Sequence, residues 1–384
     1  MFDWLWKFRV PWGVERKLLA WHAPGRPVWS SRDPSVFARE GYSKNAIAYR
    51  CVRMIAEAAA SAPLKVSPVE HPLARILARP NPEQTGVELL ESFYGHLQVA
   101  GNAYLEAAAI DDAEPSEIYV LRPDRVSVVP GADGWPIGWE HRVGPNVRRF
   151  ERDPISNDAP ILHLKLFHPA DDWYGLSPME AAAFSIDIHN AGGAWNKALI
   201  DNAARPSGAL VFTGAGGADR LSEEQFRRLK QELEDMHVGA ANAGRPLLLE
   251  GGLEWRPMSL TPSDMDFIEA RYAAARDIAL AFGVPPMLLG IPGDNTYSNY
   301  REANLAFWRQ TALPLAQKAA CGIEAWLGDR WSAAGPASVC VDLDSVAALA
   351  VEREALWARL AAADFLSEAE KRRLAGLDAP ERVH

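Results

Sequence analysis

The sequence predicts an α+β fold, and three observations support this prediction. Segments with helical hydrophobic periodicity are preceded by recurrent helix-start motifs, and short β-branched runs bounded by glycine and proline lie between them. The share of hydrophobic residues (48%) and of charged residues (23%) is that of an ordinary globular protein. With 384 residues, the chain is long enough for two or three packed modules.

Helix starts are the clearest local signals in this sequence. In a capping box, a Ser or Thr side chain and the Glu or Gln three residues later each satisfy a free backbone amide of the first helical turn. The chain has four such pairs: Thr85 with Glu88, Ser177 with Glu180, Ser222 with Gln225, and Ser367 with Glu370. A fifth start is expected at Thr261, because Pro262 fits the first helical position.

The part of the chain up to residue 176 is expected to be an α+β module. A helical pattern covers residues 45–60, and a second helix follows Thr85 and ends near Gly101. Four strand-like runs, separated by glycine and proline, follow the second helix. They cover residues 103–109, 118–121, 126–129 and 161–167.

The middle of the chain predicts a helix out, a small insert and a helix back. A long helix is expected from Ser177 to about Ala204; the pair Gly192 and Gly193 predicts close packing on another helix, or a kink. Residues 205–260 are expected to form a small insert with a strand at 208–213, a helix after Ser222 and two further strands at 247–250 and 253–259. Residues 261–282 are expected to form the return helix. This order fits a projection on a stalk better than one compact catalytic domain.

The last third of the chain begins with a loop rich in Gly, Pro and Asn at residues 290–299. A long helix is expected from Tyr300 to about Trp326, with a kink at Pro314 because proline cannot donate to the preceding turn. One strand around residues 339–343 and a helical tail over residues 346–377, broken at 365–367, complete the prediction.

Charge and cysteine content exclude some classes of protein. The net charge of −10 argues against tight, static DNA binding, which needs a basic surface, but it is compatible with a conduit through which DNA slides. Cys51, Cys321 and Cys340 have no metal or disulfide spacing and are interpreted as buried thiols of a reducing compartment.

The N-terminal segment is aromatic but interrupted by charges, so it does not fit a secretory signal, and no stretch reaches the ~20 apolar residues of a membrane span. We expect synthesis in the cytoplasm, which the resemblance described below implies to be bacterial. We also expect the Trp/Phe cluster to pack on a neighbouring subunit, with contact to a membrane or another partner as the alternative.

Motifs of catalysis are not found. Residues 214–219 lack the Lys and Ser/Thr of a phosphate-binding loop and predict a turn, and neither GxSxG nor HExxH occurs. His163 and His168 lie near Asp171 and Asp172, where a metal pair is conceivable, but solvated or core-packing histidines are the favoured interpretation. No catalytic, cofactor-binding or metal site is therefore expected, and no cofactor.

Two segments carry possible binding residues. Arg227, Arg228 and Lys230 lie among glutamates on an amphipathic helix; a solvated, ion-paired face is favoured, and contact with DNA or a docking protein is the alternative. The polar loop at 290–299 is expected to be functional, because long polar loops between helices tend to be. Its candidate residues are Asp294, Asn295, Thr296, Tyr297, Ser298 and Asn299.

Four stretches together resemble the portal protein family of long-tailed bacteriophages, which also occurs in prophages and gene transfer agents. Residues 283–315, GVPPMLLGIPGDNTYSNYREANLAFWRQTALPL, resemble that family's Gly-Val-Pro-Pro segment, Tyr-Ser-Asn loop and following Phe-Trp helix with Leu-Pro. The other three are NAIAYRCV from Asn45, GNAYLE from Gly101 and YGLSPMEAA from Tyr174, in the expected order.

The resemblance implies a portal-type fold with a wing, a two-helix stem, a small α/β clip and a short helical crown. The wing would be residues 1–176, with an N-terminal arm at 1–40. The stem would be the helices 177–204 and 261–282, and the clip between them would be residues 205–260. Residues 283–345 would hold the tunnel loop (290–299) and the long wing helix, and residues 346–384 the crown.

The resemblance also implies a function without catalytic turnover. The chain would form a ring, expected to be a dodecamer, at one capsid vertex of a virion or phage-like particle, as the channel for DNA packaging and ejection. Its partners would be further copies of itself, non-specifically bound double-stranded DNA, the major capsid protein, the terminase large subunit and a head–tail adaptor protein, with no membrane. The six loop residues would line the channel, and Arg227, Arg228 and Lys230 would dock partners at the clip.

Because the loop lacks Lys and Arg, its contact with DNA would be polar or repulsive. Two alternatives stay open at this point: a phage-encoded enzyme acting on nucleic acid or cell wall, and a monomeric or dimeric adaptor protein.

Overall fold

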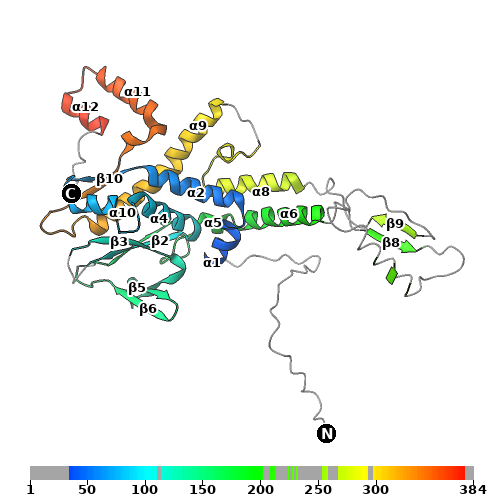
Figure 1. Cartoon of the computed structure of the whole chain (residues 1–384). Helices are drawn as coiled ribbons and strands as arrows, with labels where there is room; N and C mark the ends of the chain where they lie inside the picture. Colours follow the sequence, from blue (N-terminus) through cyan, green and yellow to red (C-terminus); the bar gives the residue numbers. More distant parts are fainter. Residues whose placement is uncertain are drawn as a thin grey trace, which may run out of the picture.

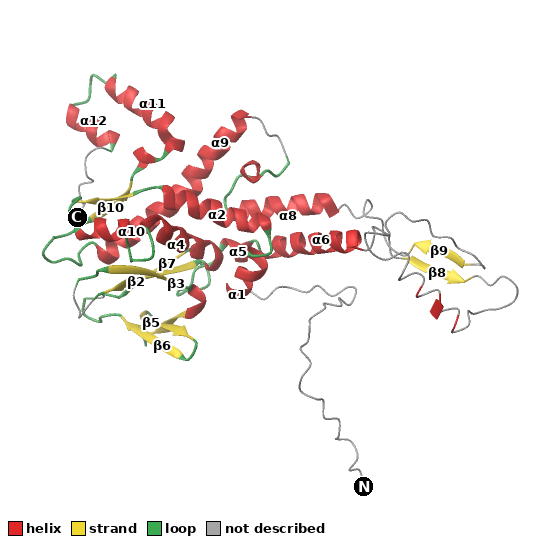
Figure 2. Ribbon diagram, viewed as in Figure 1, coloured by secondary structure: helices red, strands yellow, loops and turns green. Residues whose placement is uncertain are grey.

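The computed structural model describes residues 34–109, 114–132, 134–156, 158–201, 208–212, 253–257, 267–292 and 297–376, together with residues 224, 227, 228 and 231. A body of helices and small sheets carries a projection of two long helices, α6 (Ala183–Asp201) and α8 (Phe267–Ala281), which run side by side (Figure 1). This helical projection is called the arm below and is distinct from the N-terminal arm expected at residues 1–40. Beyond the arm lies an antiparallel strand pair of β8 (Gly208–Phe212) and β9 (Leu253–Pro257) (Figure 2). The predicted α+β class is confirmed.

Three helices form the main core of the body: α2 (Ala46–Ser61), α4 (Gly86–Ala100) and α10 (Leu313–Leu327). The helix expected after Thr85 is confirmed with its full capping box, and it ends at Gly101 in the left-handed conformation (φ 70°). Short helical pieces precede and separate these helices: α1 (Pro34–Val36), the π-helical turn η1 (Phe37–Tyr42) and α3 (Pro72–Ala78).

Two three-stranded antiparallel sheets lie beneath the helices. The first has the order β3 (Glu117–Leu121), β2 (Asn102–Ala108), β7 (Ile161–Lys165), and the second has the order β4 (Val126–Pro130), β5 (Pro136–Val143), β6 (Asn146–Glu151). A small turn, η2 (Pro123–Arg125), connects them. A separate hydrophobic cluster that includes Tyr104, Trp139, Phe150 and Ile161 lies between the two sheets.

A strand pair joins two segments of the body that lie far apart in the sequence. β1 (Leu64–Ser67) pairs antiparallel with β10 (Ser338–Val341), so that the strand predicted near 339–343 is confirmed, with a partner that the sequence analysis missed. After β10, two short turns and two helices complete the chain: η6 (Leu343–Ser345), η7 (Ala347–Leu349), α11 (Ala350–Ala361) and α12 (Glu368–Ala375). The capping box of Ser367 with Glu370 is confirmed at the start of α12.

The arm begins with two helices where one was predicted. Ser177 caps α5 (Pro178–Ala181) by accepting a hydrogen bond from the Glu180 amide at 2.9 Å, but Ala182 interrupts the helix before α6. Within α6, an added Cβ on Gly192 would lie 3.0 Å from Cγ of Arg271 on α8. The paired glycines therefore make room for this arginine, which confirms the expected close helix packing.

The long helix expected from 300 to 326 is divided into three parts. α9 (Tyr297–Phe307) is followed by the π-helical turn η5 (Trp308–Ala312), and Pro314 lies in the first turn of α10. Because proline lacks the N–H that would bond to the turn before it, the wider π turn absorbs the break. The predicted kink is confirmed at this point.

Two expectations about the cysteines are wrong. Cys51 is buried in α2, but Cys321 and Cys340 are exposed. Cys321 lies on the outer face of α10, and Cys340 points outward in a two-stranded sheet that covers the core with one face only.

The predicted helix starts at Ser222 and Thr261, the strand at 247–250 and the turn at 214–219 lie outside the described residues. No helix in the described part of the chain is long and apolar enough to cross a membrane.

Asn45 connects the body to the arm. Its side-chain Oδ1 caps α2 by accepting from the amides of Ile47 (3.1 Å) and Ala48 (3.0 Å). Its Nδ2 donates to Oδ1 of Asn190 (3.0 Å) and lies 3.2 Å from Nδ1 of His189, both on α6. Asn45 is itself 1% exposed, so its side chain is enclosed between α2 and α6.

A second buried network fixes the start of the arm. An added Cβ on Gly101 would lie 2.2 Å from the carbonyl oxygen of Gly175, so only glycine permits this backbone crossing. Oδ1 of Asn102 accepts from the Gly175 amide at 2.8 Å and lies 3.0 Å from Nε2 of His163. The His163 ring stacks on Tyr104, with the ring centroids 4.3 Å apart, and burial lowers the pKa of His163 to about 3.

Replacing Asn45 with Ala should lower the free energy of unfolding by roughly 2–4 kcal/mol, because a helix cap is lost, two partly buried side chains of α6 lose a partner and a small void forms at a buried position. Asn45→Asp keeps the cap acceptor and should cost less. Urea unfolding of both variants measures the difference. A loss for Asn45→Ala no larger than the ~1 kcal/mol of an isolated cap would contradict the connection to α6.

The depressed pKa of His163 predicts acid destabilisation. The unfolded chain binds this proton below about pH 6.5 and the folded chain only near 3, so the stability present above 6.5 is lost as the pH falls between these values. His163→Gln should reduce the slope of unfolding free energy against pH in this window by roughly 1.4 kcal/mol per pH unit. An unchanged slope in urea titrations at several pH values would show that His163 is not responsible.

Candidate functional site

The loop between α8 and α9 begins at a glycine that no other residue could replace without strain. Gly283 has φ 67°, and an added Cβ would lie 2.9 Å from Oγ1 of Thr311. The same Thr311 hydroxyl, in the π turn η5, donates a hydrogen bond of 2.6 Å to the Gly283 carbonyl. The start of the loop is thus fastened to the turn that follows α9.

The loop then runs back along α8. After the turn η4 (Pro286–Leu289), the left-handed Gly290 (φ 72°) redirects the chain. Ile291 is 5% exposed and packs on Ala275 and Ala279 of α8. One residue further, the Arg276 guanidinium donates to the Pro292 carbonyl at 2.7 Å. An apolar contact and a charge-assisted hydrogen bond therefore fix the point at which the polar part of the loop leaves α8.

The six predicted loop residues fall into two groups. Asp294, Asn295 and Thr296 lie outside the described residues. Tyr297, Ser298 and Asn299 form the first turn of α9, so the expectation that the loop extends to residue 299 is wrong. Ser and Asn are compatible with a first helical turn, where their side chains can satisfy free backbone groups.

The clip candidates lie at the other end of α8. Glu224, Arg227, Arg228 and Gln231 are helical and exposed, and their spacing of three and four residues places them on one face of a helix. Lys230 lies outside the described residues. α8 has 15 residues and so spans roughly 22 Å. The two candidate sites therefore stay apart, one at each end of the arm (Figure 1).

The His/Asp group considered as a metal pair has structural roles. His163 is the partly buried ring described above, whereas Nδ1 of His168 accepts from the Ala170 amide at 3.0 Å. Burial opposes ionisation of Asp171, but hydrogen bonds from the amides of Tyr174 and Trp173 hold the pKa of its carboxyl below the usual value. Across the part of the chain that the structure describes, no group of three or more His, Cys, Asp or Glu side chains could hold a metal ion.

Two residues that anchor the loop were missed by sequence analysis. Arg276 looks like any exposed arginine of an amphipathic helix, and Thr311 acts through a π turn that no local pattern announces. The nearby Pro314 was the available signal, because it marks where regular helical hydrogen bonds must fail.

Comparison with known proteins identifies the fold and its setting. Residues 46–376 match the family model of phage portal proteins. A chain in the neck of a native gene transfer agent (GTA) particle, computed with C12 symmetry, is 52% identical, with a TM-score of 0.70, and the match covers 93% of this chain and 96% of that one.

Sequence relatives agree with this match. The portal protein of Enterobacteria phage HK97 is 28% identical over 296 residues, which are 73% of this chain and 66% of that protein. An uncharacterized protein of Rickettsia bellii is 43% identical over 345 residues, or 88% of each chain.

Removing the Arg276 guanidinium should release the loop without unfolding the arm. In Arg276→Ala, amide hydrogen exchange over residues 288–292 should become at least fivefold faster, because the bond to Pro292 is lost. Arg301→Ala, at an exposed position of α9, is the matched control and should leave these rates unchanged. Equal protection in both variants would show that Arg276 does not hold the loop.

Proposed function

The chain belongs to the phage portal protein family, and we propose that it forms the DNA channel in the neck of a phage-like particle. One observation carries the proposal: the match to the GTA neck chain extends over 93% of the sequence at 52% identity. Similarity of this extent includes the body and the arm together, and so supports the same place at one capsid vertex for this protein. DNA would pass through the channel during packaging and ejection.

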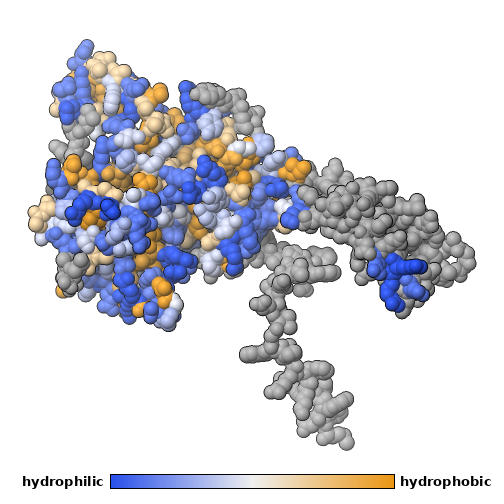
Figure 3. Space-filling model, in the orientation of Figure 1, coloured by the Kyte–Doolittle hydropathy of each residue, from blue (hydrophilic) through white to orange (hydrophobic). Residues whose placement is uncertain are grey.

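A ring of twelve copies is the assembly that we infer, and the C12 symmetry of the related neck supports it. In a closed ring each copy contacts the next through two different faces. α6 exposes Phe184 (55%), and α8 exposes Ile268 (63%) and Leu280 (79%). Figure 3 shows hydrophobic residues among hydrophilic ones on the surface of the body and the arm. We assign these two helical faces to contacts between neighbouring stems.

The segment at 290–299, which comprises the polar part of the loop and the first turn of α9 and includes Asp294, Asn295, Thr296, Tyr297, Ser298 and Asn299, is proposed to border the channel. The sequence of this loop contains no Lys or Arg, and the whole chain carries a net charge of −10. Each phosphate neutralised by a cation would add salt-dependent affinity and slow the passage of DNA. A polar loop held at its base by Arg276 and Thr311 can instead guide the duplex through shape and hydrogen bonds.

The other partners are assigned by position in the proposed ring. The clip (205–260), with Arg227, Arg228 and Lys230, would bind the terminase large subunit during packaging and a head–tail adaptor protein afterwards. The wing (1–176) would contact the major capsid protein, the stem would comprise 177–204 and 261–282, and residues 346–384 would form a crown inside the capsid.

Portal proteins are structural, and we propose no catalytic activity for this chain. The energy of packaging would come from the separate terminase motor. The enzyme alternative would require an activity on nucleic acid or cell wall in the purified protein, and the adaptor alternative would require a stable monomer or dimer.

Native mass spectrometry of the purified full-length chain tests the proposed assembly. A dominant species of twelve subunits is expected. A stable monomer or dimer, combined with absence of the chain from purified particles, would contradict the portal assignment and favour the adaptor.

Charge reversal at the clip should weaken partner docking while the ring stays intact. For the pair Arg227→Glu and Arg228→Glu, we expect at least tenfold weaker binding of the adaptor or terminase protein to immobilised rings, because rim charges steer association. Reversal at Lys371 and Arg372 on α12 is the matched control and should leave this affinity unchanged. Equal affinities for both pairs would show that the clip helix is not the docking surface.

A further inference from the structure

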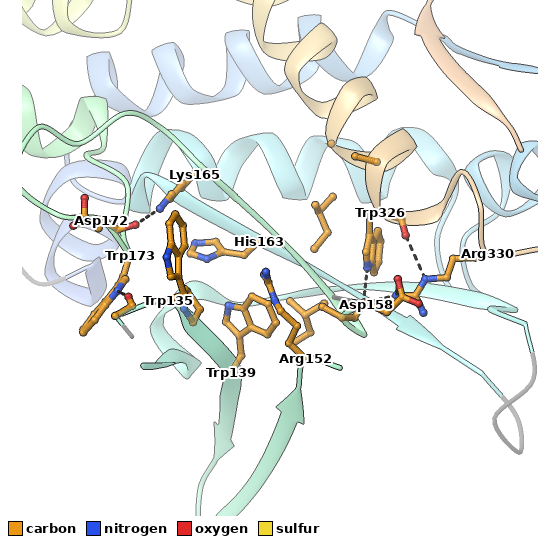
Figure 4. Close-up of a pocket in the computed structure, with 17 residues that line it drawn as sticks. Trp135, Trp139, Arg152, Asp158, His163, Lys165, Asp172, Trp173, Trp326 and Arg330 are labelled. Atoms are coloured by element: carbon orange, nitrogen blue, oxygen red, sulfur yellow. Dashed lines mark hydrogen bonds and ion pairs between the residues drawn. The ribbon is translucent and has the colours of Figure 1, made fainter. Parts of the chain in front are cut away.

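A tryptophan-lined cleft lies in the body, where the start of β5, β7 and α10 border it. It has a volume of about 890 Å³. Four indoles line it from three separate parts of the chain: Trp135 and Trp139, Trp173, and Trp326 (Figure 4). A cleft of this size and aromatic character is typical of a site that binds a ligand or a peptide.

Two of the indoles are fixed by their own N–H groups, and a third is exposed. Nε1 of Trp173 donates to the Gly134 carbonyl at 3.0 Å, and Nε1 of Trp326 donates to the Ala159 carbonyl at 2.8 Å. These two walls are therefore formed before any partner binds, which lowers the entropic cost of binding. Trp135, at the rim, is 74% exposed, which is unusual for so large an aromatic side chain.

The side chains that line the cleft carry more positive than negative charge. The cations are Arg152, Lys165 and Arg330, and the carboxylates are Asp158 and Asp172. Asp158 already lies 3.7 Å from the Arg330 guanidinium. The sign of this local charge is opposite to that of the whole chain, which carries a net charge of −10. A cationic cleft on an acidic protein favours an anionic partner, because opposite charges steer and orient association.

A further lysine adds to the positive charge from one turn along α10. Nζ of Lys318 donates to the backbone carbonyl of Lys165 at 2.5 Å, and Nζ of Lys165 in turn donates to the backbone carbonyl of Asp172. These acceptors are neutral, so the two bonds hold the ammonium groups without balancing their charge. Partial burial, and then the charge of Lys165, lower the pKa of Lys318. A carboxylate brought to this end of the cleft would relieve the repulsion between the two lysines.

The arrangement of the charges favours a peptide over a strand of nucleic acid. Figure 4 shows Asp172 beside Lys165 at one end of the cleft, and Asp158 beside Arg330 at the other. A single strand carries a phosphate at every nucleotide, so along the cleft it would meet both carboxylates as well as the cations. An acidic peptide can place one carboxylate beside the lysines and an apolar side chain against the indoles.

The cleft lies on the side of the body opposite the loop between α8 and α9. The turn η4 of that loop packs on α8 and α2, α2 packs on α4 and α10, and α10 packs on β7. Figure 1 shows the loop on one side of these helices and the strands β5 and β6 on the other. With the loop bordering the channel, as proposed above, the cleft lies toward the outside of the ring. The protein that surrounds the ring there is, by the same proposal, the major capsid protein.

We propose that the tryptophan-lined cleft binds an acidic segment of the major capsid protein. An apolar side chain of that segment packs against Trp135 and Trp173, which Figure 4 shows near the Lys165 end of the cleft, and an adjacent Asp or Glu pairs with Lys165 and Lys318. The inference rests on the proposed function, because the position of the cleft in the ring identifies the partner. It adds the site and the chemistry of a contact that the assignment of the whole wing leaves open.

Carbodiimide crosslinking of purified particles tests the contact, because this reagent joins a lysine amine directly to a neighbouring carboxylate. We expect Lys165 or Lys318 to be joined to an Asp or Glu of the capsid protein, as identified by mass spectrometry of the crosslinked peptides. Particles that contain the chain but lack this crosslink, or in which the two lysines are joined only to Asp172 or to another copy of the chain, would refute the docking and leave the channel proposal intact. Absence of the chain from the particles would refute both.

Matched variants test the charged part of the cleft. The measurement is the amount of purified capsid protein retained by immobilised full-length rings whose mass is first verified by native mass spectrometry. Lys165→Gln combined with Lys318→Gln should reduce retention at least fivefold. Arg142→Gln, at an exposed cation of β5 outside the cleft, is the control and should leave retention unchanged. Equal retention by the double variant and the control would contradict the proposal.

The aromatic part and the nature of the partner are tested in the same assay. Trp135→Ala should also reduce retention at least fivefold, whereas Trp357→Ala on α11 should not. Retention should survive digestion of the sample with nuclease. Its loss after digestion would assign the cleft to nucleic acid and overturn the proposal, as would full retention by Trp135→Ala.

Discussion

The position of the arm depends on the side chain of Asn45. Its carbonyl oxygen caps α2, and its amide nitrogen contacts His189 and Asn190 on α6. Nδ2 of Asn190 in turn donates to the Glu40 carbonyl at 3.0 Å. Burial and the nearby Arg271 lower the pKa of His189, so the neutral ring keeps Nδ1 free to accept from Asn45. One buried polar residue thus couples the end of a core helix to the direction of the arm, and in the proposed ring of identical subunits that direction would set the geometry of the channel.

A single helix, α8, connects this junction to both proposed functional regions, the clip and the polar loop. α8 packs along α6 where Gly192 admits Arg271, and it lies between the proposed clip at one end and the polar loop at the other. The π turn η5 fixes two further elements: Thr311 binds Gly283 at the start of the loop, and Nε of Arg309 donates to Glu352 of α11 at 3.1 Å. The loop and the C-terminal helices are therefore fastened to the same irregular turn, which itself results from the proline that follows it.

Much of the fold could be predicted because its signals are local. The capping boxes of Thr85 and Ser367, the left-handed Gly101 and the break at Pro314 act within one or two helical turns, and the sequence pattern states them directly. β5 and β6 were missed because their charged residues obscure the alternation, and β1 because its partner β10 is far away in the chain. The roles of Asn45 and Arg276 could not be predicted, since each depends on contacts between distant segments. The family resemblance supplied the portal function, which no single residue of the loop or clip reveals.

The central claim is that identical copies of this chain surround a channel bordered by the loop between α8 and α9. A cryo-electron microscopy reconstruction of the purified full-length protein tests it most directly. The account predicts a closed ring of about twelve subunits, with α6 and α8 of neighbouring copies in contact and residues 290–296 at the narrowest part of the bore. A ring with this loop on its outer surface, or particles without a central channel, would contradict it.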